Sequence, residues 1–264
     1  MQERNFPIGA PILEVKNISL SFGGVKAITD SSFSVLQHEV RAIIGPNGAG
    51  KSSMLNCING IYKPQEGQIK FKGEVLEKNN PNLIAQKGLS RTFQNLALFK
   101  RMSVLDNILV GRKLHMTANF LQVAFQTPQA REEERVNRER CEEIVEFLEI
   151  EDIKDTPVGK LPYGLQKKVE LGRALATEAD ILLLDEPMAG MNVEEKREMC
   201  RFILKVNDEL GTTMVLIEHD MGVVMDISDN VVVLDYGKII ADGPPEEVRV
   251  NQEVIDAYLG VAHD

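Results

Sequence analysis

The first third of the chain alternates short apolar segments with polar, glycine-containing turns. The apolar segments hold Ile12, Val15, 18–22, 33–36, 40–44 and 68–71. They are rich in β-branched and aromatic residues, which pack well on a pleated surface. The polar residues 37–39 between two of the segments have the composition of a turn. This pattern predicts a run of connected β-strands.

The middle of the chain, from about residue 96 to residue 160, has a helical pattern. After Pro128, apolar residues recur at the i, i+3, i+4, i+7 spacing of one helix face, at Cys141, Ile144, Val145 and Leu148. Charged residues of both signs crowd positions 131–143. A mixed charge run of this kind is typical of a solvated helix face, and we assign it no function.

The last part of the chain alternates buried-looking strands with helices. The segments 181–184, 213–217 and 231–234 are almost entirely Val, Ile, Leu and Met. A helical stripe between residues 199 and 210 ends at Gly211. Continuous apolar strands between amphipathic helices indicate a parallel sheet covered on both faces. The expected fold class is therefore α/β.

Composition narrows the functional classes. The net charge of −10 and the pI near 5.1 argue against an electrostatic grip on nucleic acid or on anionic lipid. The apolar runs are far shorter than the ~20 residues of a membrane-spanning helix, and residues 1–7 have no apolar signal core. The three cysteines have no metal-ligand spacing, so we interpret them as reduced thiols of a cytosolic protein.

A phosphate-binding loop is the strongest motif. Residues 45–52 match G-x-x-x-x-G-K-[ST] and lie between a predicted strand and a helix-like segment, as the motif requires. Backbone N–H groups and the helix N-terminus would bind phosphates. We expect Lys51 to reach the β- and γ-phosphates and Ser52 to bind Mg²⁺. The predicted nucleotide contacts are Gly45, Pro46, Asn47, Gly48, Ala49, Gly50, Lys51, Ser52 and Ser53.

Acidic residues and a histidine follow two of the buried strands. Asp185 ends the apolar run 181–184 and is placed to hold the Mg²⁺ shell. Glu186 is next along and is placed to accept a proton from the attacking water. His219 follows the strand 213–217, at the end where open α/β sheets bind ligands. A neutral imidazole there is able to donate a hydrogen bond to the γ-phosphate.

These residues resemble the ATP-binding subunits of ABC transporters over essentially the whole chain. By resemblance, Phe22 stacks on adenine, Gln94 is the Q-loop glutamine that contacts Mg²⁺ and water, and His219 is the switch histidine. Each also has a structural reading: Phe22 as core, Gln94 as a surface amide, and residues 161–166 as a helix start. The place of the family signature, commonly Leu-Ser-Gly-Gly-Gln, is taken by Leu161, Pro162, Tyr163, Gly164, Leu165 and Gln166.

Within that family, the chain is most similar to the branched-chain amino acid (Liv-type) subunits, in residues 21–24, 91–95, 185–192, 217–220 and 254–260. The resemblance implies a RecA-like P-loop NTPase sheet with an N-terminal antiparallel β-subdomain. The core lobe would hold residues 1–95 and 165–264, and an inserted helical subdomain residues 96–164.

The same resemblance implies the partners and the place of work. We expect a second ABC ATPase subunit or a second copy of this chain, two membrane permeases, and indirectly a periplasmic solute-binding protein. The chain would bind ATP and Mg²⁺ at the cytoplasmic face of the inner membrane as a peripheral protein, with no nucleic acid. The segment 93–99 and the helical lobe would dock the permeases, although Leu98 and Phe99 could equally be core.

The signature departs from the family pattern. Pro162 has neither the hydroxyl nor the backbone N–H of the serine it replaces, and Leu165 replaces the usual glutamine. Asn192 lies where the family's D-loop often has aspartate. We therefore hypothesise two unequal ATP sites in the assembled dimer, with the site on this chain's phosphate loop the more active one.

Two other functional classes remain open. A non-transport ABC ATPase acting on DNA or ribosomes would commonly carry a long coiled-coil insertion or tandem ATPase domains, and this chain has neither. A partner subunit that senses ATP with weak hydrolysis is favoured by the altered signature. The intact Lys51, Asp185, Glu186 and His219 argue against it.

Overall fold

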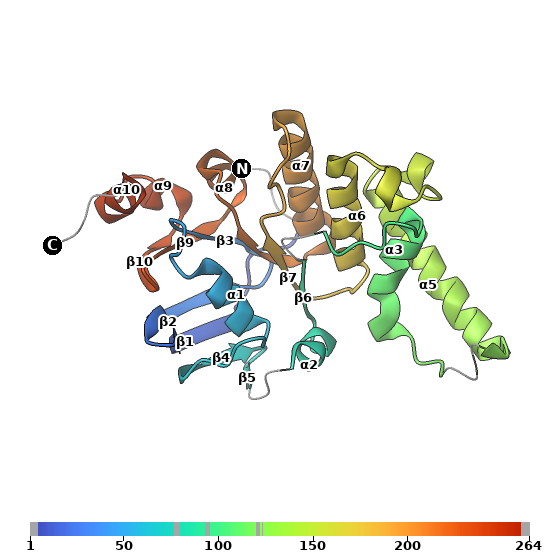
Figure 1. Ribbon diagram of the computed structural model, residues 1–264, viewed down its shortest axis with the longest axis horizontal. Helices are drawn as coiled ribbons and strands as arrows, with labels where there is room; N and C mark the ends of the chain where they lie inside the picture. Colours follow the sequence, from blue (N-terminus) through green and yellow to red (C-terminus); the bar gives the residue numbers. More distant parts are fainter. Residues whose placement is uncertain (1–4, 77–79, 93–95, 120–121, 123, 260–264) are drawn as a thin grey trace.

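The computed structural model describes residues 5–76, 80–92, 96–119, 122 and 124–259. It contains two β-sheets and a group of helices (Figure 1). The strands are β1 (Pro11–Phe22), β2 (Val25–Leu36), β3 (Val40–Ile44), β4 (Glu66–Phe71), β5 (Glu74–Val75), β6 (Leu89–Arg91), β7 (Ile181–Asp185), β8 (Thr213–Ile217), β9 (Asn230–Asp235) and β10 (Lys238–Gly243). The helices are α1 (Lys51–Ile58), α2 (Pro81–Gln86), α3 (Val104–Gly111), η1 (Arg112–His115), α5 (Pro128–Phe147), η2 (Glu151–Ile153), η3 (Val158–Lys160), α6 (Tyr163–Leu175), α7 (Val193–Leu210), α8 (Met221–Ile227), α9 (Pro245–Val248) and α10 (Gln252–Leu259).

The central sheet has the strand order β10-β9-β3-β8-β7-β6. Its strands from β9 to β6 run parallel to one another, and only β10 is antiparallel, paired with β9. The predicted α/β class and parallel sheet are therefore confirmed. The three Val/Ile/Leu-rich segments predicted as buried strands are β7, β8 and β9.

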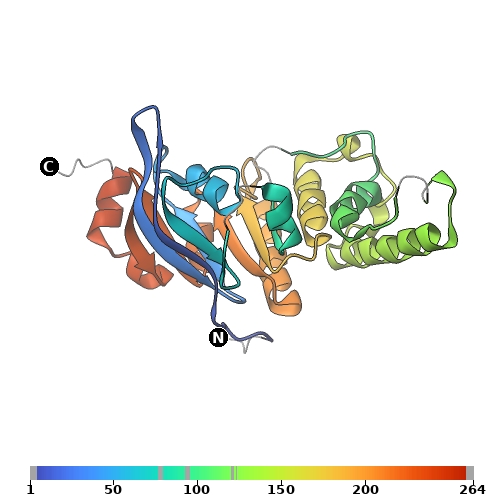
Figure 2. The ribbon, with the colours of Figure 1, turned by 90° about the horizontal axis from the view of Figure 1, so that it is seen from below.

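The central sheet is buried on both faces because alternate residues of its strands enter two different cores. In β3, Val40, Ala42 and Ile44 pack with α3, α5, α6, α7 and α8. Ile43 points the other way, toward α1 and the antiparallel sheet. Figure 2 shows the antiparallel sheet lying against the central sheet rather than continuing it. The two-sided burial explains why the strands lack polar alternation.

The second sheet is antiparallel, in the order β2-β1-β4-β5. It is the N-terminal antiparallel β-subdomain that the resemblance to ABC transporter ATP-binding subunits implies. β1 and β2 form a long hairpin whose tip is Gly23-Gly24, with φ of +51° and +89°. The hairpin carries Phe22 at its end, which places this aromatic away from the core.

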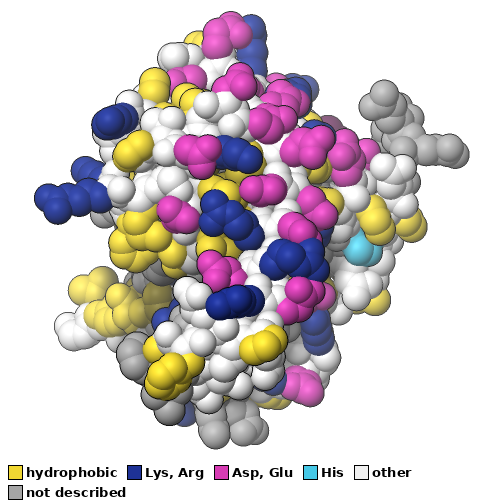
Figure 3. Space-filling view, turned by 90° about the vertical axis from the view of Figure 1, so that its right-hand side faces the viewer, with side chains coloured by type: hydrophobic (Ala, Val, Ile, Leu, Met, Phe, Trp, Pro, Cys, Tyr) yellow, Lys and Arg dark blue, Asp and Glu magenta, His cyan; other side chains and the backbone are white. Residues whose placement is uncertain are grey.

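Helices α3, α5 and α6 pack together at one side of the molecule (Figures 1 and 2). The helix predicted after Pro128 is α5, and Thr127 caps its N-terminus through the Ala130 N–H. Its charged face carries ion pairs such as Arg135 with Glu139, and Figure 3 shows acidic and basic side chains interspersed on this end of the molecule. The predicted boundary after residue 164 falls inside α6, and the division into lobes stays a prediction.

Among the described residues, none of the helices combines the length and the apolar character that crossing a bilayer requires.

Candidate functional site

Three neighbouring parallel strands end at the same edge of the central sheet. They are β3, β8 and β7, in that order across the sheet. The phosphate loop follows β3, His219 follows β8, and Asp185 and Glu186 lie at the end of β7. Carboxyl ends of adjacent parallel strands are the usual ligand-binding edge of an α/β sheet. The topology thus gathers motifs that lie 174 residues apart in sequence, at 45 and 219.

The phosphate loop depends on glycine at two positions. Gly45 has a φ of +148°, and a Cβ there would lie 2.0 Å from the Leu234 carbonyl oxygen. Gly50 has a φ of +103°, and a Cβ there would lie 2.4 Å from the Ala27 carbonyl oxygen. Only glycine tolerates both the backbone angle and the close approach. The loop leads directly into α1, whose first residue is Lys51.

Lys51 is buried and bonded to its own loop. Its Nζ donates to the carbonyl oxygens of Gly45 at 2.7 Å and of Pro46 at 2.9 Å. Burial lowers the pKa of the Lys51 ammonium, and the negative charge of Glu186 opposes that shift. The charges of Lys51 and Glu186 therefore interact, which is expected if the phosphate loop and the end of β7 form a single site.

Asp185 is held by a residue to which the sequence analysis gave no role. Its Oδ2 accepts a hydrogen bond from Arg91 Nη2 at 2.6 Å, and the two side chains are only 5% and 8% exposed. Arg91 Nη1 also donates to Asn56 Oδ1 of α1 at 2.6 Å. Arg91 thus connects the end of β7 to the helix that follows the phosphate loop. The run Arg91-Thr92 was visible as a motif in sequence, but the ion pair was not.

Glu186 and His219 face each other. The distance from Glu186 Oε1 to His219 Nε2 is 2.6 Å. Glu186 has a φ of +49°, and its N–H donates to the Ile217 carbonyl at 3.0 Å, which anchors the turn after β7 to β8. A positive φ at a non-glycine residue is often found where backbone strain serves a site. Two of the three residues predicted as catalytic, Glu186 and His219, are therefore in direct contact.

The other predicted nucleotide contacts have the following positions. Phe22 is 45% exposed and packs edge-on against Tyr62, with ring centroids 5.0 Å apart, so it is not a core residue. Ser52 is exposed at the start of α1, as a hydroxyl that binds a ligand must be. Ser53 is half-buried beside it. Gln94 lies outside the described residues.

The signature residues surround the start of α6. Pro162 is the residue before the helix and makes no side-chain cap hydrogen bond. Gln166 Nε2 donates to the Leu161 carbonyl at 2.8 Å, so its amide is turned back onto the chain. Leu165 packs against the core. A Cβ on Gly164 would lie 2.4 Å from Glu195 Oε1, in the first turn of α7.

The residue before α7 completes this contact. Asn192 caps α7 through its side chain and forms a reciprocal capping box with Glu195. Asparagine and aspartate serve almost equally as N-caps, so the exchange of one for the other preserves this turn. Tyr163 of α6 lies near Gly190 of the same turn. The signature and the turn before α7 form one packed unit.

The comparisons with known proteins agree with this geometry. Residues 28–189 match the family model described as ABC transporter. The chain belongs to the ABC transporter family. Residues 238–264 also match the model described as branched-chain amino acid ATP-binding cassette transporter. The predicted P-loop ATPase fold and family are both confirmed, and the chain is an ATP-hydrolysing cassette.

Similar proteins cover nearly the whole chain. One is the high-affinity branched-chain amino acid transport ATP-binding protein BraF of Pseudomonas aeruginosa, 42% identical over 96% of this chain and 99% of its own length. Another is LivG of Escherichia coli, 36% identical over the same shares. A solved ATP-binding cassette of an ABC transporter, in its ADP conformation, is 34% identical with a TM-score of 0.82, covering 95% of this chain and 99% of its own.

In this ABC cassette the signature lies apart from the chain's own phosphate loop. Figure 1 shows α6 beyond β7 and β6 from α1, and Figure 2 shows the same separation from another side. The pocket that Pro162, Gly164 and Leu165 line is shared with residues at the start of α7, and its lining includes no residue of the phosphate loop.

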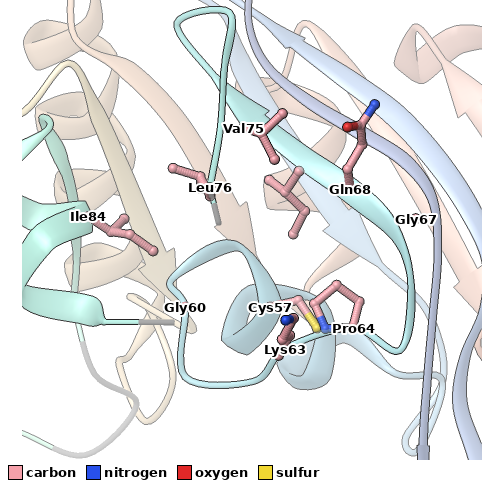
Figure 4. A pocket seen from close by; sticks show the side chains of 10 residues that line it. Cys57, Gly60, Lys63, Pro64, Gly67, Gln68, Val75, Leu76 and Ile84 are labelled. Carbon is pink, nitrogen blue, oxygen red and sulfur yellow. The ribbon is translucent and has the colours of Figure 1, made fainter. Parts of the chain in front are cut away.

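A cavity of about 330 Å³ lies between β4, β5, the end of α1 and α2 (Figure 4). It is lined by Cys57 and Ile84 among others, and opens at the end of α1 away from the phosphate loop. Burial raises the pKa of the Cys57 thiol to about 12, so the thiolate is scarce at neutral pH. None of the described residues that line this cavity is acidic or a histidine.

Proposed function

We propose that this chain binds ATP with Mg²⁺ at the β3–β8–β7 edge and hydrolyses it to drive an importer for branched-chain amino acids or a related small organic solute. The single observation that supports this most is the 2.6 Å contact between Glu186 and His219, beside the phosphate loop. A carboxylate there is positioned to take a proton from water, and the neighbouring imidazole to donate a hydrogen bond.

The residues present fit both ligands. The glycine cradle at Gly45 and Gly50 exposes backbone N–H groups, and α1 adds its positive dipole end, which suits a polyphosphate. Lys51 would exchange its loop carbonyls for phosphate oxygens. Hard oxygen donors suit Mg²⁺, and Ser52 and Asp185 would supply them. The metal would neutralise phosphate charge, while Glu186 and His219 act on the proton.

The test is Glu186→Gln in the assembled transporter. The substitution keeps the size and removes the base, so nucleotide binding should persist while hydrolysis falls by about 10²–10⁴-fold. Lys51→Ala is the matched control, because it should weaken binding itself. ATP affinity and turnover are measured on the same preparations. Turnover of Glu186→Gln at the wild-type rate would refute the assignment.

The solute and the partners are proposed from the relatives. BraF and LivG are described as branched-chain amino acid transport ATP-binding proteins. We expect a second ATPase subunit or a second copy, two permeases at the cytoplasmic face of the inner membrane, and a periplasmic binding protein. Phe99, which is 51% exposed, belongs to the predicted docking surface, whereas Leu98 packs against the core. Uptake of labelled leucine, isoleucine and valine should depend on the wild-type chain and fail with Glu186→Gln.

Unequal ATP sites form the second part of the proposal. The site that receives the segment from Leu161 to Gln166 would lack the serine donor, and the Gln166 amide donates to the Leu161 carbonyl of its own chain. Loss of one transition-state donor costs about 10²–10³-fold in rate. Pro162→Ser in the assembled transporter should therefore raise turnover. If turnover is unchanged, while Lys51→Ala and the equivalent change in the partner cost equally, the asymmetry is wrong.

A further inference from the structure

A buried glutamate beside the catalytic pair has no role in the chemistry described so far. Glu218 follows β8 directly and precedes His219, and it is only 4% exposed. Burial raises the pKa of its carboxyl. Burying a carboxyl is unfavourable unless hydrogen bonds compensate, so its partners are the natural guide to its role.

Those partners lie in the two loops that carry the catalytic pair. Glu218 Oε1 accepts the backbone N–H of Met188 at 2.8 Å, in the turn that follows β7. Glu218 Oε2 accepts the backbone N–H of His219 at 3.2 Å. Met188 is 1% exposed, so its N–H has no ready exchange with solvent. One carboxylate thus ties the turn after Glu186 to the loop that carries the histidine.

A backbone hydrogen bond also joins the turn after β7 to β8. The Glu186 N–H donates to the Ile217 carbonyl at 3.0 Å. Together with the Met188 bond, it fixes the turn on either side of Pro187, once to the last residue of β8 and once to Glu218 just after it. These two anchors hold Glu186 at its positive φ of +49° and 2.6 Å from the imidazole.

We propose that Glu218 is a positioning residue that sets the orientation of Glu186 and His219 for hydrolysis. The inference rests on the proposed function. Glu218 does not face the phosphate loop through any of its described hydrogen bonds, so it should affect turnover and not nucleotide binding. A displacement of catalytic groups by about 1 Å can cost about 10²-fold in rate.

The test compares Glu218→Ala, Glu218→Gln and Glu39→Gln in the assembled transporter. Glu39 is the matched control: it is fully buried, accepts the Leu36 N–H at 2.6 Å, and precedes β3 at the opposite edge of the sheet. We expect Glu218→Ala to lower kcat by about tenfold or more with KM for ATP within about twofold. Glu218→Gln keeps one carbonyl acceptor and should retain more activity, and Glu39→Gln should leave both constants unchanged.

A second measurement needs no turnover. The chain has 4 histidines, so the imidazole signal of His219 can be assigned by NMR with His219→Gln. In the isolated chain, Glu218→Ala should shift that signal and Glu39→Gln should not. If Glu218→Ala does not fold, the same comparison is made with Glu218→Gln.

Two outcomes are decisive. An unshifted His219 signal with wild-type kcat, or an equal loss of kcat in Glu39→Gln, overturns the inference while Glu186→Gln still abolishes hydrolysis. If Glu186→Gln itself turns over normally, the proposed function fails first and the inference falls with it.

Discussion

The ion pair between Arg91 and Asp185 gives the sharpest prediction about stability. The two side chains are 8% and 5% exposed, and Arg91 Nη2 lies 2.6 Å from Asp185 Oδ2. Arg91→Met removes the guanidinium and leaves the carboxylate buried without it. Breaking a buried pair in this way costs about 3–5 kcal/mol. The bond from Arg91 to Asn56 is lost as well.

Urea unfolding of the isolated chain measures the effect. With a urea dependence of about 3 kcal/mol per molar, the predicted loss lowers the unfolding midpoint by about 1–2 M. The assay is made without nucleotide, because a ligand that binds the folded state would mask the loss. Arg91→Lys keeps the positive charge but not the two guanidinium nitrogens that bond Asp185 and Asn56. Its unfolding midpoint should lie between those of the wild-type chain and Arg91→Met.

The control is Arg135→Met on α5. Arg135 also makes two ion pairs, with Glu132 and Glu139, but its side chain is 55% exposed. Water and salt screen solvent-exposed pairs, so the midpoint of Arg135→Met should hardly move. If Arg91→Met shifts the midpoint no more than Arg135→Met does, the pair does not hold Asp185 and the reasoning is refuted.

Two further predictions concern the loop and the helix after His219. Gly45→Ala places a Cβ 2.0 Å from the Leu234 carbonyl oxygen, so it should destabilise the chain by about 1–3 kcal/mol in urea. Gly48→Ala is the control: Gly48 also has a positive φ, of +84°, but no atom lies within 4 Å of its Cβ position, so it should cost less. Lys196 bonds Asp220 at 2.7 Å and lowers the pKa of that carboxyl. The pair therefore stabilises the fold above the ordinary aspartate value of 3.8 and stops doing so as pH falls through the lowered pKa. Lys196→Met should lower the free energy of unfolding by under about 1 kcal/mol at pH 7, because both side chains are about a third exposed. Below the lowered pKa of Asp220 the same substitution should not change the free energy of unfolding. An equal loss of stability at both pH values would contradict this prediction.

The strands were predictable where burial is two-sided. Segments such as 214–217 and 231–234 consist of consecutive apolar residues because each face of the central sheet is covered. The strand order was not predictable from those segments. β3 lies between β8 and β9, and these pairings join residues some 170 to 190 positions apart in sequence. No local pattern carries information of that range.

The site residues likewise include some that the sequence predicted and some whose contacts only the structure shows. Lys51, Asp185 and Glu186 were predicted because their motifs fix a strand, a turn and a residue type at short spacing. Arg91 reaches Asp185 across 94 residues, and Glu218 reaches Met188 across 30. Neither contact leaves a periodic pattern, so sequence reasoning could see these residues but not their partners.

The charged groups of the site each have a partner within the chain. Lys51 bonds the Gly45 carbonyl, Asp185 bonds Arg91, and Glu186 contacts His219. Nucleotide affinity is then a difference between the bonds a ligand gains and the internal bonds it displaces. Removing an internal partner of a group that stays buried should appear mainly as lost stability.

Removing a group that only orients other groups should mainly lower kcat. Arg91→Met and Glu218→Ala therefore distinguish a residue that stabilises the fold from a residue that positions catalytic groups. Arg91 neutralises a buried charge, so its loss is measured by unfolding. Glu218 aligns two loops through backbone N–H groups, so its loss is measured by turnover at unchanged KM. A variant set in which both substitutions changed stability and kcat in the same proportion would mean that folding and alignment are not separable at this edge of the sheet.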